Sequence, residues 1–369
     1  MPLLRGYSLL GPWTECSNGK YTFARKDEKE YFIKSFPYPK YPVEGMYSPR
    51  VADRMKADCR EWEKSQNQLI GELKKIAGIG GNLVVPLELF RDGNSYYKIT
   101  LKISTDSMPV DMIAKLPSAN KRLLLKTMSQ SLRTLHKARV VHGDLKPDNI
   151  LIAKSEAGNL TTKITDFDDS YFEGDPPRPE YTVGTVNYYS PELAQYIIGE
   201  DESIKKYVQC RSDVFAMGLI FHQYICGRMP EYDGYDYAYE AVLDGRSLLT
   251  DPSIAEGTRN LIDSMLLANF DKRPSIAEVF ERLKELEAIE DEIYHRVAAK
   301  PRTFTIPKRA GSLATPAKTA EPVKKTEDAI STVERLPNNQ YKITYSSGKQ
   351  RIVPEIFIKA QNLEELLVK

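Results

Sequence analysis

The 369-residue chain has few of the residues that build metal clusters or disulfide frameworks. It contains four cysteines and four histidines, and no two cysteines lie at the close spacing of a zinc site. We therefore expect Cys16, Cys59, Cys210 and Cys226 to be reduced packing residues of a cytoplasmic protein. Neither a zinc centre nor a disulfide scaffold is expected.

The sequence also lacks long hydrophobic runs and an excess of charge of one sign. No apolar stretch approaches the roughly 18 residues of a membrane-spanning helix, and the opening MPLLRGYSLLGPW is too weakly apolar for a signal peptide. Lys and Arg number 52 against 51 Asp and Glu, which gives a net charge of +1. We therefore expect that the protein binds neither nucleic acid nor a membrane. Its partners have to be inferred from local sites.

The most informative stretch is residues 140–168, VVHGDLKPDNILIAKSEAGNLTTKITDFD. Two short strands rich in β-branched residues, NILI and KITDF, flank a polar loop and predict a hairpin that brings residues 144–149 opposite Asp166. Asp144 can accept a hydroxyl proton, and Lys146 can neutralise phosphate charge. Asn149 and Asp166 offer the oxygen ligands that magnesium prefers. The stretch predicts a site for magnesium and a nucleoside triphosphate.

This stretch resembles the protein kinase family, whose catalytic loop reads H-R-D-x-K-x-x-N and whose metal motif reads D-F-G. The resemblance implies that Asp144 and Lys146 are catalytic and that Asn149 and Asp166 bind the metal. It also implies ATP and Mg²⁺ as cofactors and protein substrates as partners. Since K-P-D-N follows the catalytic aspartate, serine and threonine hydroxyls are the expected acceptors.

Two residues depart from the family motifs. Gly143 stands where the family usually has an arginine that binds a phosphate on the activation segment, so we expect activity that does not need this phosphorylation. Asp168 replaces the glycine of the metal motif and lacks its conformational freedom, so we expect a stiffer motif. The two remaining modes of control would be the position of the long helix and the C-terminal module.

The same departures raise an alternative, since H-G-D and D-F-D are also typical of aminoglycoside and choline phosphotransferases. The segment after Asp168 favours a protein kinase: GTVNYYSPEL resembles the end of a kinase activation segment, with Ser190 in place of alanine. The resemblance further implies a Glu192–Arg273 ion pair and a role for Asp213 in fixing the catalytic loop. A pseudokinase scaffold is the third interpretation, because a glycine-rich loop is missing and Phe32 replaces a small residue.

The N-terminal part, residues 1–103, has the pattern of short strands interrupted by one long helix. Lys34 ends the strand EYFIKSF, and the resemblance implies that it holds the α- and β-phosphates. Before it, GPWTECSNGKY contains no G-x-G-x-x-G motif. A turn through residues 17–19, ending at Gly19, is the predicted phosphate-binding loop, because its backbone N–H groups can face an anion.

Apolar residues at three- and four-residue spacing predict a helix over residues 51–77, which glycines then end. The resemblance requires a glutamate on this helix to pair with Lys34. The spacing to the next strand indicates Glu72, and Glu61 and Glu63 are the alternatives.

The hairpin LVVPLELF–RDGN–SYYKITLKI is expected to lead into the hinge that binds adenine. Aligned by this hairpin, Thr100 falls at the gatekeeper position. Leu101 to Ile103 would supply the hinge carbonyl and N–H groups, so Leu101 and Ile103 are predicted to bind the nucleotide.

The expected fold is α+β. It combines a two-lobed kinase-like domain over residues 1–297 (N-lobe 1–103, C-lobe 104–297), a linker over 298–330 and a small β-rich module over 331–369. The linker is rich in Pro, Ala, Thr and Lys and cannot bury enough apolar surface to fold. Hydroxyls near its basic residues are candidate autophosphorylation sites: Thr303, Thr305, Ser312 and Thr315. The module is expected to bind a protein partner or the kinase domain, since about forty residues are marginal for independent folding.

Overall fold

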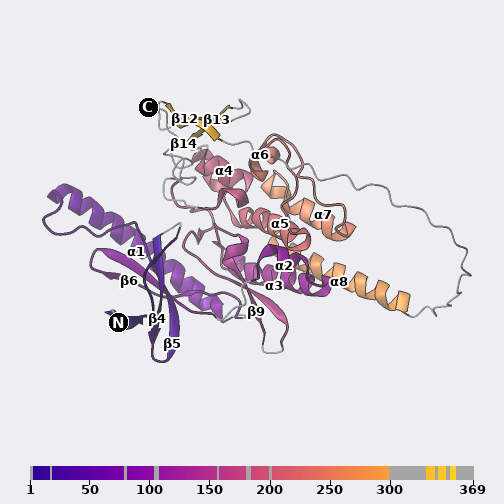
Figure 1. The fold of residues 1–369 in the computed structure, drawn as a ribbon, viewed down its shortest axis with the longest axis horizontal. Coiled ribbons are helices and arrows are strands. Elements are labelled where there is room, and N and C mark those ends of the chain that lie inside the picture. Colours follow the sequence, from indigo (N-terminus) through magenta and orange to yellow (C-terminus); the bar gives the residue numbers. More distant parts are fainter. Residues whose placement is uncertain are drawn as a thin grey trace, which may run out of the picture. The chain divides into compact units, whose positions relative to one another are not determined.

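The computed structural model describes residues 3–16, 19–78, 81–103, 108–155, 158–179, 184–198, 202–298, 330–336, 340–345 and 350–354. The chain divides into two compact units, residues 1–299 and 300–369. The first unit has a small lobe built on a curved sheet and a larger helical lobe (Figure 1). The predicted two-lobed α+β fold is therefore confirmed. Within the described ranges, no helix is long and apolar enough to cross a membrane.

The small lobe is an antiparallel sheet of seven strands in the order β1-β2-β4-β5-β7-β6, with β3 paired to β4. Inward-facing residues such as Ala24, Ile33 and Ile99 are fully buried in its core. This burial follows from the period-two pattern of the strands. The strands are β1 (Leu3–Leu4), β2 (Tyr7–Leu9), β3 (Thr14–Cys16), β4 (Gly19–Lys26), β5 (Lys29–Ser35), β6 (Pro86–Asp92) and β7 (Ser95–Leu101).

The long helix α1 (Pro49–Ala77) packs beside this sheet and agrees with the helix predicted for residues 51–77 (Figure 1). Pro49 occupies the first turn, where a missing N–H costs no hydrogen bond. The side chains of Cys59, Leu69 and Leu73 are buried, so one face of the helix contributes to the core. The segment between β5 and α1 is irregular, as its prolines predict.

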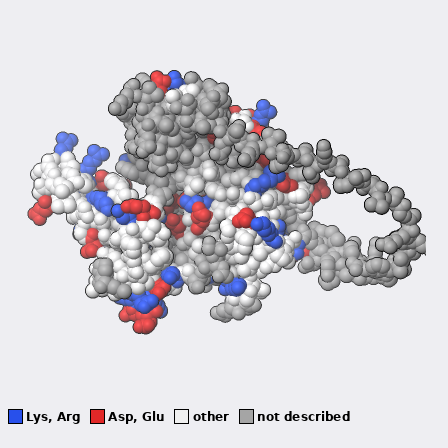
Figure 2. Space-filling view, in the orientation of Figure 1, with Lys and Arg blue, Asp and Glu red and all other residues white. Residues whose placement is uncertain are grey.

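The large lobe surrounds α5 (Cys210–Cys226), which is buried on nearly every face and ends at Gly227 in the left-handed conformation. Around it are packed α2 (Val110–Ala114), α3 (Ser118–Lys137), α4 (Pro191–Ile197), α6 (Ala238–Leu243), α7 (Glu256–Met265) and α8 (Ile276–Ala298). The large lobe also contains the short strands β8 (Val140–Val141), β9 (Ile150–Lys154), β10 (Leu160–Ile164) and β11 (Tyr171–Phe172), and β9 pairs with β10 as the predicted hairpin. On the face shown in Figure 2, charges of both signs are interspersed, in keeping with the net charge of +1.

The second unit contains an antiparallel sheet of β12 (Ile330–Leu336), β13 (Gln340–Tyr345) and β14 (Gln350–Pro354). The predicted β-rich character of this module is confirmed. Residues 337–339, 346–349 and 355–369 of the module lie outside the described part of the chain. So do most of the predicted linker and its four candidate phosphorylation sites.

Candidate active site

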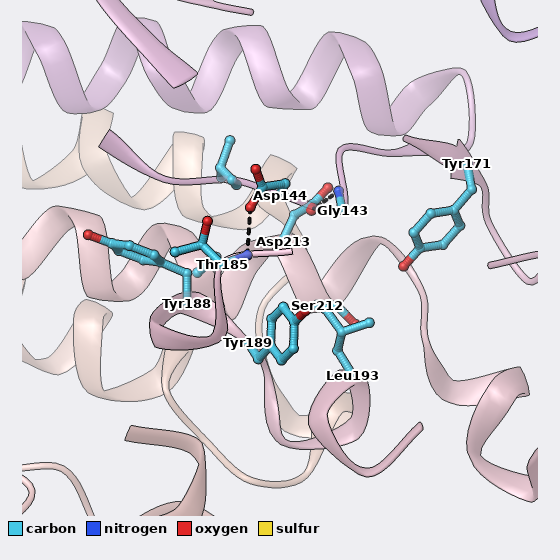
Figure 3. A pocket seen from close by; sticks show the side chains of 11 residues that line it. Gly143, Asp144, Tyr171, Thr185, Tyr188, Tyr189, Leu193, Ser212 and Asp213 are labelled. Atoms are coloured by element: carbon cyan, nitrogen blue, oxygen red, sulfur yellow. Dashed lines mark hydrogen bonds between the residues drawn. The ribbon is translucent and has the colours of Figure 1, made fainter. Parts of the chain in front are cut away.

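The catalytic loop lies between β8 and β9. A side chain in the first turn of α5 anchors its backbone through hydrogen bonds. The Asp213 carboxylate accepts hydrogen bonds from the backbone N–H groups of His142 (2.8 Å) and Gly143 (3.1 Å; Figure 3). Its other contact is His136 Nε2 at 2.9 Å, from the end of α3. Asp213 is buried, so these partners compensate the loss of its hydration. The prediction that Asp213 fixes the catalytic loop is confirmed.

Asp144 lies at the centre of a short polar chain. Lys146 Nζ donates to Asp144 Oδ2 at 2.6 Å and also to Thr185 Oγ1 at 2.7 Å. The Thr185 backbone N–H donates to the other carboxylate oxygen of Asp144 at 2.9 Å, as Figure 3 shows. Asn149 Nδ2 donates to the Asp144 carbonyl oxygen at 2.7 Å. The structure thus brings together three predicted site residues, and it adds Thr185 as a contact between the catalytic loop and the segment that follows.

Gly143 meets a steric limit that the sequence does not reveal. Its φ is +82°, in the left-handed region that favours glycine, and a Cβ atom there would lie 2.3 Å from the backbone oxygen of Asp169. An arginine at this position would need this backbone to move. Glycine at this position, in place of the family's arginine, therefore allows the catalytic loop to pack closely against the residues after β10.

The ammonium group of Lys34, on β5, contacts two aspartates that follow β10. Its Nζ lies 3.3 Å from Asp166 Oδ1 and 2.5 Å from Asp168 Oδ2. The Asp166 side chain keeps 35% of its surface exposed, whereas Asp168 keeps 7%. Burial opposes the charged ammonium, but Asp168 and then Asp166 outweigh burial and raise the pKa of Lys34 above its ordinary value.

A second lysine shares Asp168. Lys98 lies directly opposite Lys34 on the neighbouring strand β7, and its Nζ is 2.5 Å from Asp168 Oδ1 and 3.0 Å from Gln66 Oε1 on α1. Burial disfavours the charged carboxylate of Asp168, yet Lys98 and Lys34 hold its pKa well below the usual range. At Asp166, burial and the nearby Asp168 charge raise the pKa to about 6, against the opposing effect of Lys34.

The predicted pair between Lys34 and a glutamate of the long helix is wrong for this structure. Glu72 is partly buried and pairs with Lys75, one turn further along α1, at 2.6 Å. Of the alternatives, Glu63 accepts a hydrogen bond from the Tyr96 hydroxyl, and Glu61 is exposed. The residue of α1 that faces the lysine cluster is the neutral Gln66, which is buried. Helical spacing alone does not reveal which side of α1 faces β5 and β7, so the sequence analysis assigned the wrong residue.

The predicted nucleotide-binding residues of the small lobe lie along the same sheet. Thr100 pairs across the strands with Phe32, and Leu101 with Tyr31. Lys102, between Leu101 and Ile103, donates its backbone N–H to the Glu30 carbonyl oxygen at 3.0 Å. Gly19 begins β4, and a Cβ atom there would meet the Ser35 backbone oxygen at 2.1 Å, so close strand pairing accounts for this glycine. Residues 17 and 18 of the predicted phosphate turn lie outside the described part of the chain.

The donor set fits a magnesium ion delivered with a nucleotide. Asn149 uses its amide nitrogen on Asp144, so its carbonyl oxygen is the atom it can offer to a cation. Asp166 has an accessible carboxylate and a φ of +62°, an unfavourable backbone conformation of the kind found at functional sites. Within the described ranges, no cluster of three or more His, Cys, Asp or Glu residues can hold a metal by itself. Two protein oxygens suit Mg²⁺, which takes its remaining ligands from water and phosphate.

The segment after the metal motif is anchored by a buried ion pair. Arg273 donates to both carboxylate oxygens of Glu192 at 2.7 Å, and both side chains are almost fully buried. The Glu192–Arg273 pair predicted from the sequence is confirmed. Arg273 also donates to the backbone oxygens of Leu267 and Ala268, so it joins α4 to the loop after α7.

Comparison with known proteins agrees with this architecture. Residues 51–283 match the family model described as "Protein kinase domain". The chain is 28% identical over 197 residues to serine/threonine-protein kinase PDK1 of Cryptococcus neoformans. The aligned region covers 51% of this chain and 15% of that protein. It is 30% identical over 166 residues to serine/threonine-protein kinase DCLK1 of Rattus norvegicus (43% and 35% covered).

A third relative is the ovarian-specific serine/threonine-protein kinase Lok of Drosophila melanogaster, 25% identical over 233 residues, with 62% of this chain and 45% of that protein covered. The matches thus span less than half the length of these three relatives. The family model spans well over half of the present chain. With its two lobes, catalytic loop and buried Glu192–Arg273 pair, the chain belongs to the protein kinase family.

Proposed function

We propose that this protein transfers the γ-phosphate of ATP to serine or threonine hydroxyls of protein substrates. The observation that supports this most is the position of Asp144, which is hydrogen-bonded to Lys146 and to the Thr185 backbone at the start of the segment leading to α4. Asp144 would accept the proton of the attacking hydroxyl, and Lys146 would stabilise charge on the phosphoryl group. Two observations support serine/threonine specificity. Residues 146–149 read K-P-D-N, and the relatives named above are serine/threonine-protein kinases.

Lys34, Asn149 and Asp166 complete the proposed site. Lys34 would contact the α- and β-phosphates, while Asn149 and Asp166 would hold Mg²⁺. The ion would neutralise phosphate charge during transfer. Gly19, Thr100, Leu101 and Ile103 remain the proposed contacts of the phosphates and the adenine.

The proposal extends to the rest of the chain. We assign the kinase domain to residues 1–297, with lobes 1–103 and 104–297, a linker to 298–330 and a partner-binding or docking module to 331–369. Autophosphorylation of the linker and a cytoplasmic location are part of the proposal. The proposed location agrees with the four cysteines, which are free thiols.

Labelled ATP and a choice of acceptors test the proposed reaction. The full chain is incubated with a generic protein substrate, or with choline and an aminoglycoside, and the labelled product is identified. We expect label on serine or threonine of protein. Label on the small molecules alone would instead indicate a small-molecule phosphotransferase, the reading that H-G-D and D-F-D favour.

A pseudokinase scaffold is favoured by one observation, namely that Lys34 has two carboxylate partners within the protein. Thermal unfolding with millimolar Mg²⁺ and ATP separates this case from an enzyme. A stabilising shift together with label transfer supports the kinase, whereas no shift and no transfer supports the scaffold.

A further inference from the structure

Two buried lysines lie face to face behind the proposed phosphate site. Lys34 and Lys98 are directly opposite on β5 and β7, and they are only 7% and 3% exposed. Like charges in this arrangement repel each other, and burial adds to the cost. Asp168 lies between them at 2.5 Å from each ammonium group, one carboxylate oxygen per lysine. This bridging carboxylate offsets the repulsion.

The two aspartate partners of Lys34 differ in what else they can do. Asp166 is one-third exposed and is the proposed metal ligand, so its charge is shared with the ion when nucleotide binds. Asp168 is buried, and its ionic partners among the described residues are the two lysines. Asp168 is therefore the partner that can hold Lys34 in place with or without the metal.

We propose that Asp168 is the positioning residue that orients Lys34 toward the nucleotide phosphates, in the role for which a helix glutamate was predicted. This inference rests on the proposed function. Lys98 pairs with the other carboxylate oxygen of Asp168. Gln66 of α1 accepts a hydrogen bond from Lys98 at 3.0 Å. Helix α1 thus contributes a neutral amide to the cluster, and the orientation of Lys34 does not depend on an ion pair with this helix.

The test measures binding of magnesium-free ATP by calorimetry and thermal unfolding of the full chain. Asp168→Asn keeps the shape of the side chain but removes its charge. We expect a lower melting temperature, because Lys98 is left buried without a counter-charge. We also expect ATP affinity to fall by about tenfold or more, because Lys34 loses the buried carboxylate nearest to its ammonium group.

The double variant Lys98→Met/Asp168→Asn separates positioning from stability. It removes the stranded lysine, so we expect the melting temperature to recover toward that of the wild type. Lys34 still lacks its buried partner, so ATP affinity should stay as low as in Asp168→Asn. Lys98→Met alone keeps Asp168 beside Lys34 and should keep wild-type affinity.

Glu72→Gln is the matched control and should bind ATP as the wild type does. The proposal is overturned if the double variant regains wild-type ATP affinity, since Asp168 would then serve only to neutralise Lys98. It is also overturned if Asp168→Asn binds normally or if Glu72→Gln binds weakly. If the wild-type chain does not bind ATP, the proposed function and this inference are both overturned. This outcome is distinguishable from the others, because the wild type itself then shows no affinity that a variant could change.

Discussion

Gly143 lies in the catalytic loop with a φ of +82°, and its backbone passes close to the Asp169 carbonyl oxygen. We expect Gly143→Ala to lower the free energy of unfolding by about 2–5 kcal/mol, from the left-handed conformation and the clash together. Chemical denaturation measures this change. Gly174→Ala is the control, because Gly174 has a similar φ of +87° but open space around its would-be Cβ. It should cost about 1–2 kcal/mol, and equal losses in the two variants would disprove the steric account.

Asp169 gives stability a pH dependence. Burial, and then the charges of Asp144, Asp168 and Asp166, raise its pKa to about 8. Because the unfolded carboxyl titrates near pH 4, the folded state binds more protons between these values, and stability falls as pH rises toward 8. In EDTA we expect this loss between pH 6.5 and 8, above the range in which Asp166 titrates.

Asp169→Asn isolates this effect. The variant should lose much of the slope of unfolding free energy against pH in this window, as measured by denaturant titrations at several pH values. It should also gain stability relative to the wild type at pH 8. An unchanged slope would show that Asp169 is not the group responsible.

At the same scale, the sequence predicted which candidate site residues of the loop lie together better than it predicted the partner of Lys34. Asp144, Lys146 and Asn149 lie within six consecutive residues, so the loop brings them together almost regardless of the surrounding packing. The partner of Lys34 depends instead on how β7, α1 and the segment after β10 meet in space. Two signals were present in the sequence: a lysine within the strand SYYKITL, and the second aspartate of D-F-D.

At the scale of elements, the buried Arg273 connects α4, α5 and the loop after α7. Its side chain donates to the Glu192 carboxylate and to the backbone oxygens of Leu267, Ala268 and Arg211. We expect Arg273→Leu to destabilise the protein by about 3–5 kcal/mol, because it removes the counter-charge of a buried carboxylate, which keeps only Ser212 Oγ as a donor among the described residues, and takes one donor from each of the three carbonyl oxygens. Denaturant unfolding monitored by tryptophan fluorescence measures the loss.

Lys115→Met provides the matched surface control, since its ion pair with Asp111 is largely exposed on both sides. Removal of that pair should change stability by less than about 1 kcal/mol. A comparable loss in both variants would contradict the assignment of Glu192–Arg273 as the anchor of this segment. The helix pattern could predict α1 because its apolar residues recur at three- and four-residue spacing, but the side of α1 that faces the sheet is decided by tertiary packing.

For the whole molecule, we expect phosphate-transfer activity that does not require phosphorylation of the activation segment. Gly143 offers no arginine to bind such a phosphate, and the Thr185 backbone already contacts Asp144 in the unmodified chain. We expect phosphatase-treated protein to keep most of its transferase activity. Activity that disappears on this treatment and returns after incubation with ATP would contradict the prediction.

The domain arrangement was predictable from composition at a coarse level only. The Pro, Ala, Thr and Lys content predicts the linker, and the alternation of apolar and polar residues predicts the C-terminal strands, which β12 to β14 confirm. No motif in the sequence predicts a binding target for the module. A chain ending at Val297 would reveal by its altered activity whether the module regulates the kinase domain.

The central claim is that Asp144 is the base of a protein phosphotransferase. The most direct test compares the steady-state transfer of label from ATP to a protein substrate by the wild type and by Asp144→Asn. We expect kcat to fall by about a hundred- to ten-thousand-fold, the contribution of a positioned general base, with the KM for ATP little changed because Lys34 and Asp166 are untouched. Wild-type turnover by the Asp144→Asn variant would contradict the account.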